Sequence, residues 1–155
     1  MDSSHERTKA LMTGALPVLP CACASLRRAA RAVSQLYDDE LRPTGLNTAQ
    51  FTLLTALASG GPVTQGRLGW LLAIDSTTLS RTLRPLEAKG WIGRASGEDR
   101  RERRIDLTVA GRRLLAAATP AWERAQGRLR ARLGARKWVA LLADLSRVAG
   151  DARRA

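Results

Sequence analysis

The spacing of the apolar residues changes abruptly after Gly90. Up to Gly90, and again beyond residue 110, apolar residues recur three or four positions apart, which is the period of amphipathic helices. In between, Ile105, Leu107 and Val109 alternate with polar residues, as in a strand. Two short strands do not form a stable sheet by themselves, so they must pack against the helices. The sequence therefore predicts a mainly α fold with a small β-hairpin.

Capping residues mark where the helices begin. Side chains that can accept a hydrogen bond from the first helical turn precede four of the apolar segments: Asn47, Thr64, Asp75 and Thr108. Asn47 is followed three residues later by Gln50, which is the pattern of a capping box. The predicted helices lie at about 20–42, 47–60, 64–73, 75–90 and 108–133, and from 135 onward.

The chain is strongly basic. Its 155 residues contain 26 Lys and Arg against 14 Asp and Glu, which gives a formal net charge of +12. A polyanion is therefore the expected partner, and arginine suits phosphates and guanine edges. No apolar run approaches the ~18 to 20 residues that span a bilayer, and the N-terminus, with Asp2 and Glu6, is unlike a signal peptide. We expect a cytoplasmic protein without a membrane segment.

The segments 64–73 and 75–90 are joined by almost no connecting residues. This is typical of a helix-turn-helix, in which a first helix braces a second that enters the major groove of DNA. The second segment has one narrow apolar face, and five polar residues remain for its other side: Ser76, Thr77, Ser80, Arg81 and Arg84. Small hydroxyls let DNA approach closely, and the two arginines can reach phosphates or guanine O6 and N7. The alternative is an ordinary amphipathic helix with a polar outer face.

Seven charged residues stand in a row at 98–104, between the two predicted strands. A charge run by itself is typical of a solvated loop. Beside a helix-turn-helix, however, a basic hairpin tip is suited to be a wing, because the negative potential of the minor groove attracts arginine. The candidates for contact with DNA are Arg100, Arg101 and Arg103. Asp99 would be repelled by phosphate, so we expect it to pair with Arg101 or Arg103 and to hold the shape of the tip.

Three stretches together resemble the winged helix-turn-helix regulators of the MarR family. They are LNTAQFTLLTAL, DSTTLSRTLRPLEAKGWIGR and DRRERRIDLTVAG. In that family an Asp-x-Arg wing tip is followed by a strand that ends in Leu-Thr and by a Gly three residues later. Residues 99–101 and 107–111 match this pattern position by position, and the resemblance covers about residues 25–148.

The resemblance implies a homodimer that binds a palindromic operator in double-stranded DNA. Arg101 would enter the minor groove, the five polar residues of 75–90 would form the reading surface, and Thr64 and Gln65 would meet the DNA backbone. It also implies four regions: an N-terminal arm (1–19), a dimerisation helix (20–44), a winged helix-turn-helix domain (45–110) and C-terminal dimerisation helices (111–155).

Cys21 and Cys23 lie at the beginning of the first predicted helix, close to Arg27 and Arg28. A helix N-terminus and nearby cations favour the reactive thiolate, so the pair is a candidate sensor of oxidants. Several regulators that the chain resembles sense oxidants through an N-terminal cysteine. One alternative is a pair of small, semi-buried residues in an alanine-rich segment. Another is a metal site, although two sulfurs do not complete a tetrahedral zinc site.

Two further groups are expected to have structural roles. The carboxylates Asp38, Asp39 and Glu40 end the first helix and are expected to form a solvated face. The four tryptophans are expected in the core or at an interface: Trp70, Trp91, Trp122 and Trp138.

The sequence thus predicts a dimeric, sequence-specific transcriptional regulator, a repressor that a small molecule or an oxidant releases from DNA. One alternative is a basic nucleic-acid-binding module without sequence preference. Another is a small enzyme that uses Cys21 or Cys23, although that segment contains no candidate general base. No Gly-rich phosphate loop and no metal-ligand spacing occurs, so we expect no cofactor, no metal and no enzymatic activity.

Overall fold

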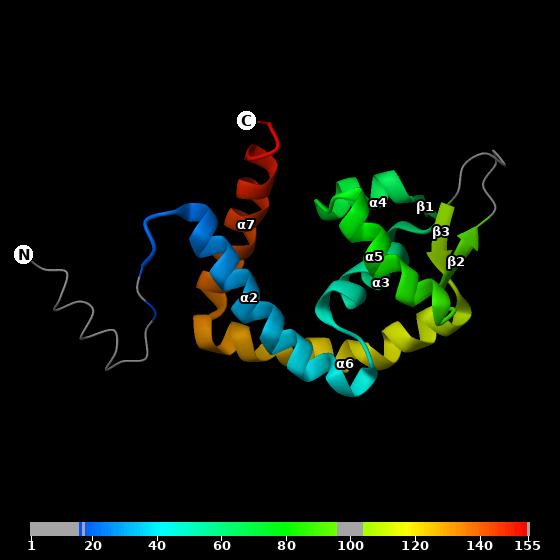
Figure 1. Ribbon diagram of the computed structural model, residues 1–155. Helices are drawn as coiled ribbons and strands as arrows, with labels where there is room; N and C mark the ends of the chain where they lie inside the picture. The colour runs from blue at the N-terminus through cyan, green and yellow to red at the C-terminus, as the bar shows by residue number, and fades with distance from the viewer. Residues whose placement is uncertain (1–15, 17, 96–103, 155) are drawn as a thin grey trace, which may run out of the picture. The chain divides into compact units, whose positions relative to one another are not determined.

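The computed structural model describes residues 16, 18–95 and 104–154 (Figure 1). Its elements are α2 (Ala22–Leu41), η1 (Arg42–Thr44), α3 (Thr48–Gly60), β1 (Val63–Thr64), α4 (Gln65–Leu72), α5 (Ser76–Ala88), β2 (Ile92–Ala95), β3 (Arg104–Leu107), α6 (Val109–Leu133) and α7 (Ala135–Asp151). The chain divides into two compact units, one up to Gln35 and one from Leu36 onward. The predicted mainly α fold with a small β element is confirmed.

The core of the second unit is built around α3. Leu53, Leu54 and Leu57 are fully buried on this helix, because α3 packs against α5, α6 and β3. A helix with neighbours on several sides needs apolar residues around most of its circumference rather than on one stripe. Trp122 of α6 adds to this core by stacking on Phe51 of α3, with 5.9 Å between the ring centroids. α3 is therefore the element against which α5, α6 and β3 all pack.

The sheet has three antiparallel strands in the order β1–β3–β2, rather than the two strands of the predicted hairpin. β2 and β3 pair as predicted, with Ile92 opposite Leu107. β1 adds Val63 opposite Ile105 and Thr64 opposite Arg104. The sequence did not predict β1, because two residues are too few to show an alternating pattern. The pairing places the segment just before α4 directly beside the base of the hairpin.

Four helices begin at the N-cap residues that the sequence predicts. In each cap, the backbone N–H three residues later donates to the capping side chain. The pairs are Gln50 to Asn47 at 2.9 Å, Arg67 to Thr64 at 3.2 Å, Thr78 to Asp75 at 2.9 Å and Gly111 to Thr108 at 3.0 Å. The backbone N–H of Asn47 also donates to the side chain of Gln50 at 3.2 Å, which completes the capping box. These four predicted caps are confirmed.

The first turn of α6 lies tightly against the segment that precedes β2. The backbone N–H of Thr108 donates to the carbonyl of Trp91 at 3.1 Å, and the hydroxyl of Thr108 donates to the carbonyl of Gly90 at 2.7 Å. A Cβ atom on Gly111 would lie 1.9 Å from the carbonyl oxygen of Trp91. Only glycine therefore fits at position 111.

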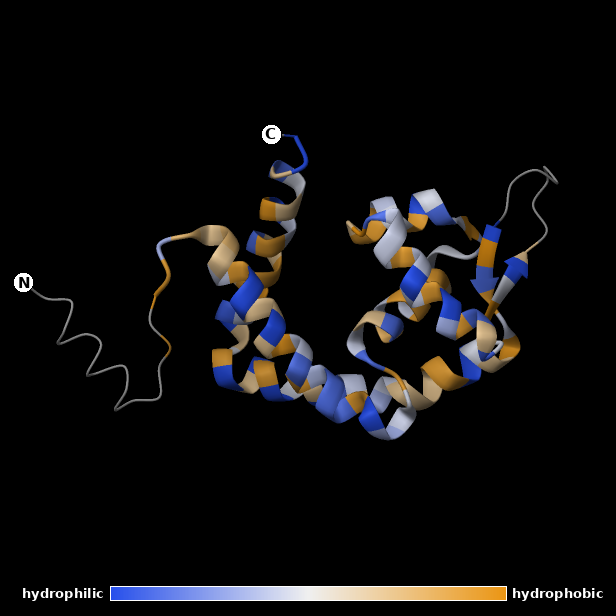
Figure 2. Cartoon of the chain, in the orientation of Figure 1, coloured by the Kyte–Doolittle hydropathy of each residue, from blue (hydrophilic) through white to orange (hydrophobic). Residues whose placement is uncertain are grey.

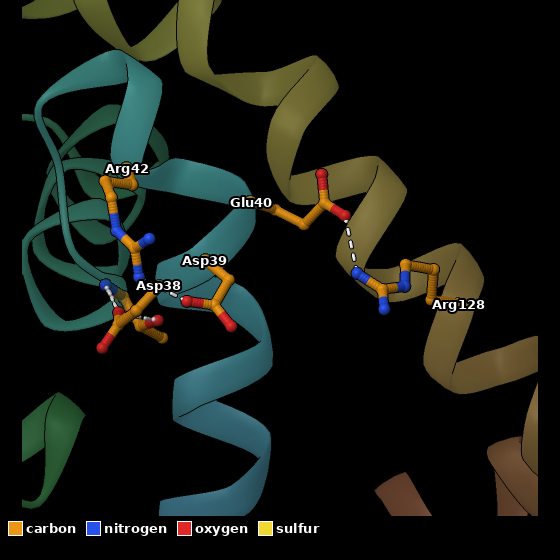
Figure 3. Close-up of polar contacts among 6 residues, drawn as sticks. Asp38, Asp39, Glu40, Arg42 and Arg128 are labelled. Atoms are coloured by element: carbon orange, nitrogen blue, oxygen red, sulfur yellow. Dashed lines mark hydrogen bonds and ion pairs between the residues drawn. The ribbon is translucent and has the colours of Figure 1, made fainter.

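The prediction that Asp38 and Glu40 belong to a solvated face is wrong. Asp38 accepts hydrogen bonds from the backbone N–H and the hydroxyl of Thr48, both at 2.6 Å, and so holds the beginning of α3. The side chain of Glu40 is only 19% exposed and binds two arginines of α6, Arg124 at 3.0 Å and Arg128 at 2.9 Å. Figure 3 shows Glu40 facing Arg128, while Asp39 pairs with Arg42 on the same stretch of chain.

Glu40 is ionised under ordinary conditions. Hydrogen bonds from Arg128 and Arg124 hold the pKa of its carboxyl below the usual value of 4.5. Because the folded-state pKa is lowered, this contact stabilises the fold above the unfolded pKa, and the stabilisation is lost as the pH falls through the folded value. The ion pairs of Glu40, which connect the end of α2 to α6, are therefore weakened only at acidic pH.

Candidate nucleic-acid interface

The turn between α4 and α5 is short and closely packed. Ala73 adopts a left-handed backbone conformation with a φ of 54°, and the backbone N–H of Ile74 donates to the carbonyl of Gly69 at 3.0 Å. A Cβ atom on Gly69 would lie 3.0 Å from the carbonyl oxygen of Ile74. The absence of a side chain at Gly69 thus lets the chain fold back immediately after α4. This geometry is that of the predicted helix-turn-helix.

Helix α5 separates its residues into a buried face and an exposed face as the sequence predicts. Leu79, Leu83 and Leu86 are buried against the core. On the outer side, Ser76, Thr77, Arg81 and Arg84 are exposed. The helix continues through Pro85 to Ala88. Four of the five predicted reading residues therefore lie on a surface that a DNA duplex could reach.

The fifth reading residue, Ser80, is placed differently. Its hydroxyl oxygen accepts a hydrogen bond of 2.7 Å from the side-chain amide of Gln65, and both residues are half-buried. Thr64 is also half-buried, and its hydroxyl caps α4. Gln65 and Ser80 thus join the bracing helix to the predicted recognition helix. The hydroxyl oxygens of Ser80 and Thr64 thus both accept hydrogen bonds from α4.

A negative charge stands at the N-terminus of α5. The side-chain hydroxyl and the backbone N–H of Thr78 donate to Asp75, and these bonds hold the pKa of its carboxyl below the usual 3.8. A carboxylate at this end is favoured by the helix dipole. Asp75 therefore stabilises the beginning of the helix, while Arg81 and Arg84 supply positive charge one and two turns later.

A pocket of about 300 Å³ opens where α4 meets α5. Its lining comprises Gln65, Gly66, Gly69, Trp70, Ile74, Ser76 and Leu79. Gln65 and Ser76 are predicted DNA contacts, so the pocket lies at the edge of the candidate interface. The sequence did not predict this pocket, because its lining residues come from two helices and the turn between them.

The predicted wing tip, with Asp99, Arg100, Arg101 and Arg103, lies outside the described residues. The base of the wing is described, since β2 and β3 lead into and out of it (Figure 1). Arg94 on β2 is exposed and was not singled out by the sequence analysis. Its position on a strand that leads to the wing, in a basic chain, is the signal that could have identified it.

The predicted sensor cysteines lie at the beginning of α2. Cys21 immediately precedes the helix, where its carbonyl accepts the backbone N–H of Ser25 at 3.0 Å, and Cys23 is the second helical residue. Both side chains are exposed and neither forms a disulfide. The alternative that these cysteines are semi-buried is therefore wrong for the described chain.

Helix α7 carries both hydrophobic and hydrophilic residues (Figure 2), and the described chain leaves large apolar side chains on one of its faces exposed. The exposed fractions on this face are 37% for Leu141, 47% for Leu142, 41% for Leu145 and 46% for Val148. Their spacings of three and four positions place them on one side of the helix. A contiguous apolar stripe of this kind is typical of a protein–protein contact.

Two kinds of feature are absent from the described residues. No helix there combines the length and the apolar composition that crossing a membrane requires. Among residues 16, 18–95 and 104–154, no three or more His, Cys, Asp or Glu side chains are grouped closely enough to hold a metal ion.

Comparison with known proteins gives a consistent result. Residues 44–102 match the model of the MarR family. An uncharacterized HTH-type transcriptional regulator of Bacillus subtilis (strain 168), YwoH, is 35% identical over 83 residues, which are 54% of this chain and 61% of that protein. A second HTH-type transcriptional regulator, from Bacillus cereus, is 33% identical over 87 residues. The chain thus matches 61% and 58% of the lengths of these two relatives.

Solved structures extend the similarity over most of the chain. The transcriptional regulator MosR of M. tuberculosis, solved in complex with DNA, is 34% identical, with a TM-score of 0.77, and the match covers 86% of this chain and 97% of MosR. The transcriptional repressor CouR, solved bound to a 23-mer DNA duplex, is 30% identical, with a TM-score of 0.76 and coverage of 83% and 92%. The chain belongs to the MarR family of helix-turn-helix transcriptional regulators.

Proposed function

We propose that this protein is a homodimeric repressor that binds a palindromic operator in double-stranded DNA. The observation that carries the proposal is the exposed outer face of α5, with Arg81 and Arg84 on a helix that α4 braces. An α-helix of this kind fits the major groove. MosR and CouR, which share the fold over most of their length, were both solved with DNA.

The proposed DNA contacts fall into two groups. Ser76, Thr77, Arg81 and Arg84 read the major groove. Thr64 and Gln65 lie at the DNA backbone, where Gln65 also joins α4 to Ser80 of α5. The predicted wing residues are proposed to reach the minor groove, with Arg101 inserted and Asp99 holding the tip. A basic module without sequence preference is the alternative. It predicts equal affinity for all duplexes at a given salt concentration.

Substitution of Arg81 by alanine tests the reading surface. If Arg81 reads a base, the variant should lose about 1–3 kcal/mol of discrimination between the operator and random DNA. If it binds a phosphate, affinity for both duplexes should fall together, and the salt slope should decrease by about one. Salt titrations on both duplexes measure this. The control is Arg132→Ala, which removes the same charge from an exposed position at the end of α6. An Arg81→Ala variant that binds like this control would contradict the proposed surface.

The dimer is proposed to form through the helical regions outside the winged domain, 20–44 and 111–155, with 1–19 as an N-terminal arm. The apolar stripe of α7 supports this assignment, because nothing in the described chain covers it fully. A palindromic site also calls for a protein with matching two-fold symmetry.

Release from DNA is proposed to follow a signal, either a small molecule or the oxidation of Cys21 and Cys23. Exposure of both thiols supports the second route, because peroxide and soft thiol reagents need access to sulfur. Either signal must favour a dimer whose recognition helices no longer match successive major grooves.

The thiol route predicts that peroxide lowers the affinity of the native protein for its operator. A double variant, Cys21→Ser with Cys23→Ser, should bind the operator as the native protein does and should resist peroxide. Fluorescence anisotropy with a labelled operator, before and after oxidation and again after reduction, measures the change. Equal losses of affinity in the two proteins would show that the cysteines are not the switch.

A further inference from the structure

Trp70 on α4 is exposed to 57%, although the sequence predicts a tryptophan of the core or of an interface. Two guanidinium groups lie over its ring. Arg67, one turn earlier on α4, has its Cζ atom 4.3 Å from the ring centroid, and Arg153, just beyond α7, has its Cζ atom 5.3 Å away. Arg153 also donates a hydrogen bond from Nη2 to the backbone carbonyl of Trp70. The end of the chain is thus bound to both the side chain and the backbone of Trp70.

The carbonyl that accepts this bond belongs to the last turn of α4, directly before the turn of the helix-turn-helix. The backbone N–H of Ala73 donates to the same oxygen at 3.4 Å, and Asp75, two residues after Ala73, caps α5. The C-terminal end of a helix carries partial negative charge, so a cation is favoured there. Arginine also suits the position, because its planar fork can donate to a carbonyl while it covers an aromatic ring. Arg153 therefore binds the end of α4, next to the turn that joins α4 to α5.

The same helix that ends beside Arg153 has the apolar stripe described above, from Leu141 to Val148. α7 is one continuous helix of 17 residues. It therefore links the surface proposed for subunit contact to the turn before the proposed recognition helix.

We propose that Arg153 is a positioning residue for DNA reading. By tying the α4–α5 turn to α7, it sets the distance at which the two subunits of a dimer present their recognition helices. This inference rests on the proposed function. It assigns to Arg153 a role through Trp70 and not a contact with DNA.

Arg154 provides a matched control. It is the next residue, it has the same charge, and its guanidinium pairs with Asp151 at 3.0 Å. In the absence of DNA, Arg153→Ala should speed hydrogen exchange at the backbone amides of Ala73 and Ile74 about three- to tenfold, whereas Arg154→Ala should leave it unchanged. Mass spectrometry of peptides that cover residues 65–75 measures this without any assumption about DNA. Equal exchange rates in the two variants would overturn the contact, whatever the protein does with an operator.

The second measurement concerns spacing. The native protein should prefer an operator over one whose half-sites are separated by one additional base pair. In Arg153→Ala this preference should shrink about three- to tenfold with an unchanged salt slope, because no phosphate contact is lost. Arg154→Ala should keep the preference. If Arg153→Ala instead keeps the preference and lowers the salt slope by about one, Arg153 binds a phosphate and the positioning role is overturned.

Discussion

Replacing Gly111 by alanine is expected to destabilise the fold by about 3 kcal/mol. The added Cβ would lie 1.9 Å from the carbonyl oxygen of Trp91, and that atom is backbone, which cannot rotate away. The first turn of α6 cannot shift easily either, because Thr108 binds the carbonyls of Gly90 and Trp91 through its hydroxyl and its backbone N–H. Denaturant unfolding followed by circular dichroism measures the loss as a lower midpoint.

Gly127 is the control for this substitution. It lies on the same helix and is exposed, and an added Cβ would meet no atom within 4 Å. Gly127→Ala should therefore stabilise the protein by about 0.5–1 kcal/mol, since alanine loses less backbone entropy than glycine in a helix. If both variants shifted the midpoint in the same direction, the close approach of α6 to Trp91 would be wrong.

The double variant Leu142→Glu with Leu145→Glu is expected to convert the protein into a monomer. Each substitution places a charge within the apolar stripe of α7, where an unpaired carboxylate would have to be buried on association. A monomer holds only one half of a palindromic site. Its operator affinity should therefore fall by about 10²- to 10⁴-fold, the factor that linking two binding modules supplies. Light scattering measures the mass, and anisotropy titration measures the affinity.

The matched control places the same charges on the other side of α7. Ala140 and Ala143 are exposed there, so Ala140→Glu with Ala143→Glu changes the net charge equally without entering the stripe. This control should remain dimeric and bind the operator with near-native affinity. Mass and affinity that respond equally to both double variants would show that the stripe is not the subunit contact.

The features that the sequence predicted are those with short-range causes. A cap such as Asp75 acts on a backbone N–H three residues away, and the buried leucines of α5 follow a helical period. Gly111 was identified only as part of the family pattern. The structure gives the physical reason for it, which is the carbonyl of Trp91 where a side chain would stand.

The features that the sequence did not predict depend on partners far along the chain. Asp38 and Glu40 resemble any exposed acidic run until Thr48, Arg124 and Arg128 are placed beside them. The same holds for Ser80, whose polar position on α5 predicts exposure. Its actual partner, Gln65, lies 15 residues earlier on α4. Patterns of polarity give the face of an element, but they do not give the neighbour that meets that face.

Strand β1 has a consequence for how the protein would meet a duplex. Thr64 is at once the last residue of β1, paired opposite Arg104 at the base of the wing, and the cap of α4. β3 at the base of the wing and helix α4 are therefore held together through Thr64. The hydrogen bond between Gln65 and Ser80 connects α5 to the same unit. When one rigid unit binds two grooves of DNA, the entropy cost of lost rotation is incurred once. Two independently moving elements would each incur that cost. Mutations that separate β1 from β3 would then weaken DNA binding even if every DNA-contacting side chain were kept.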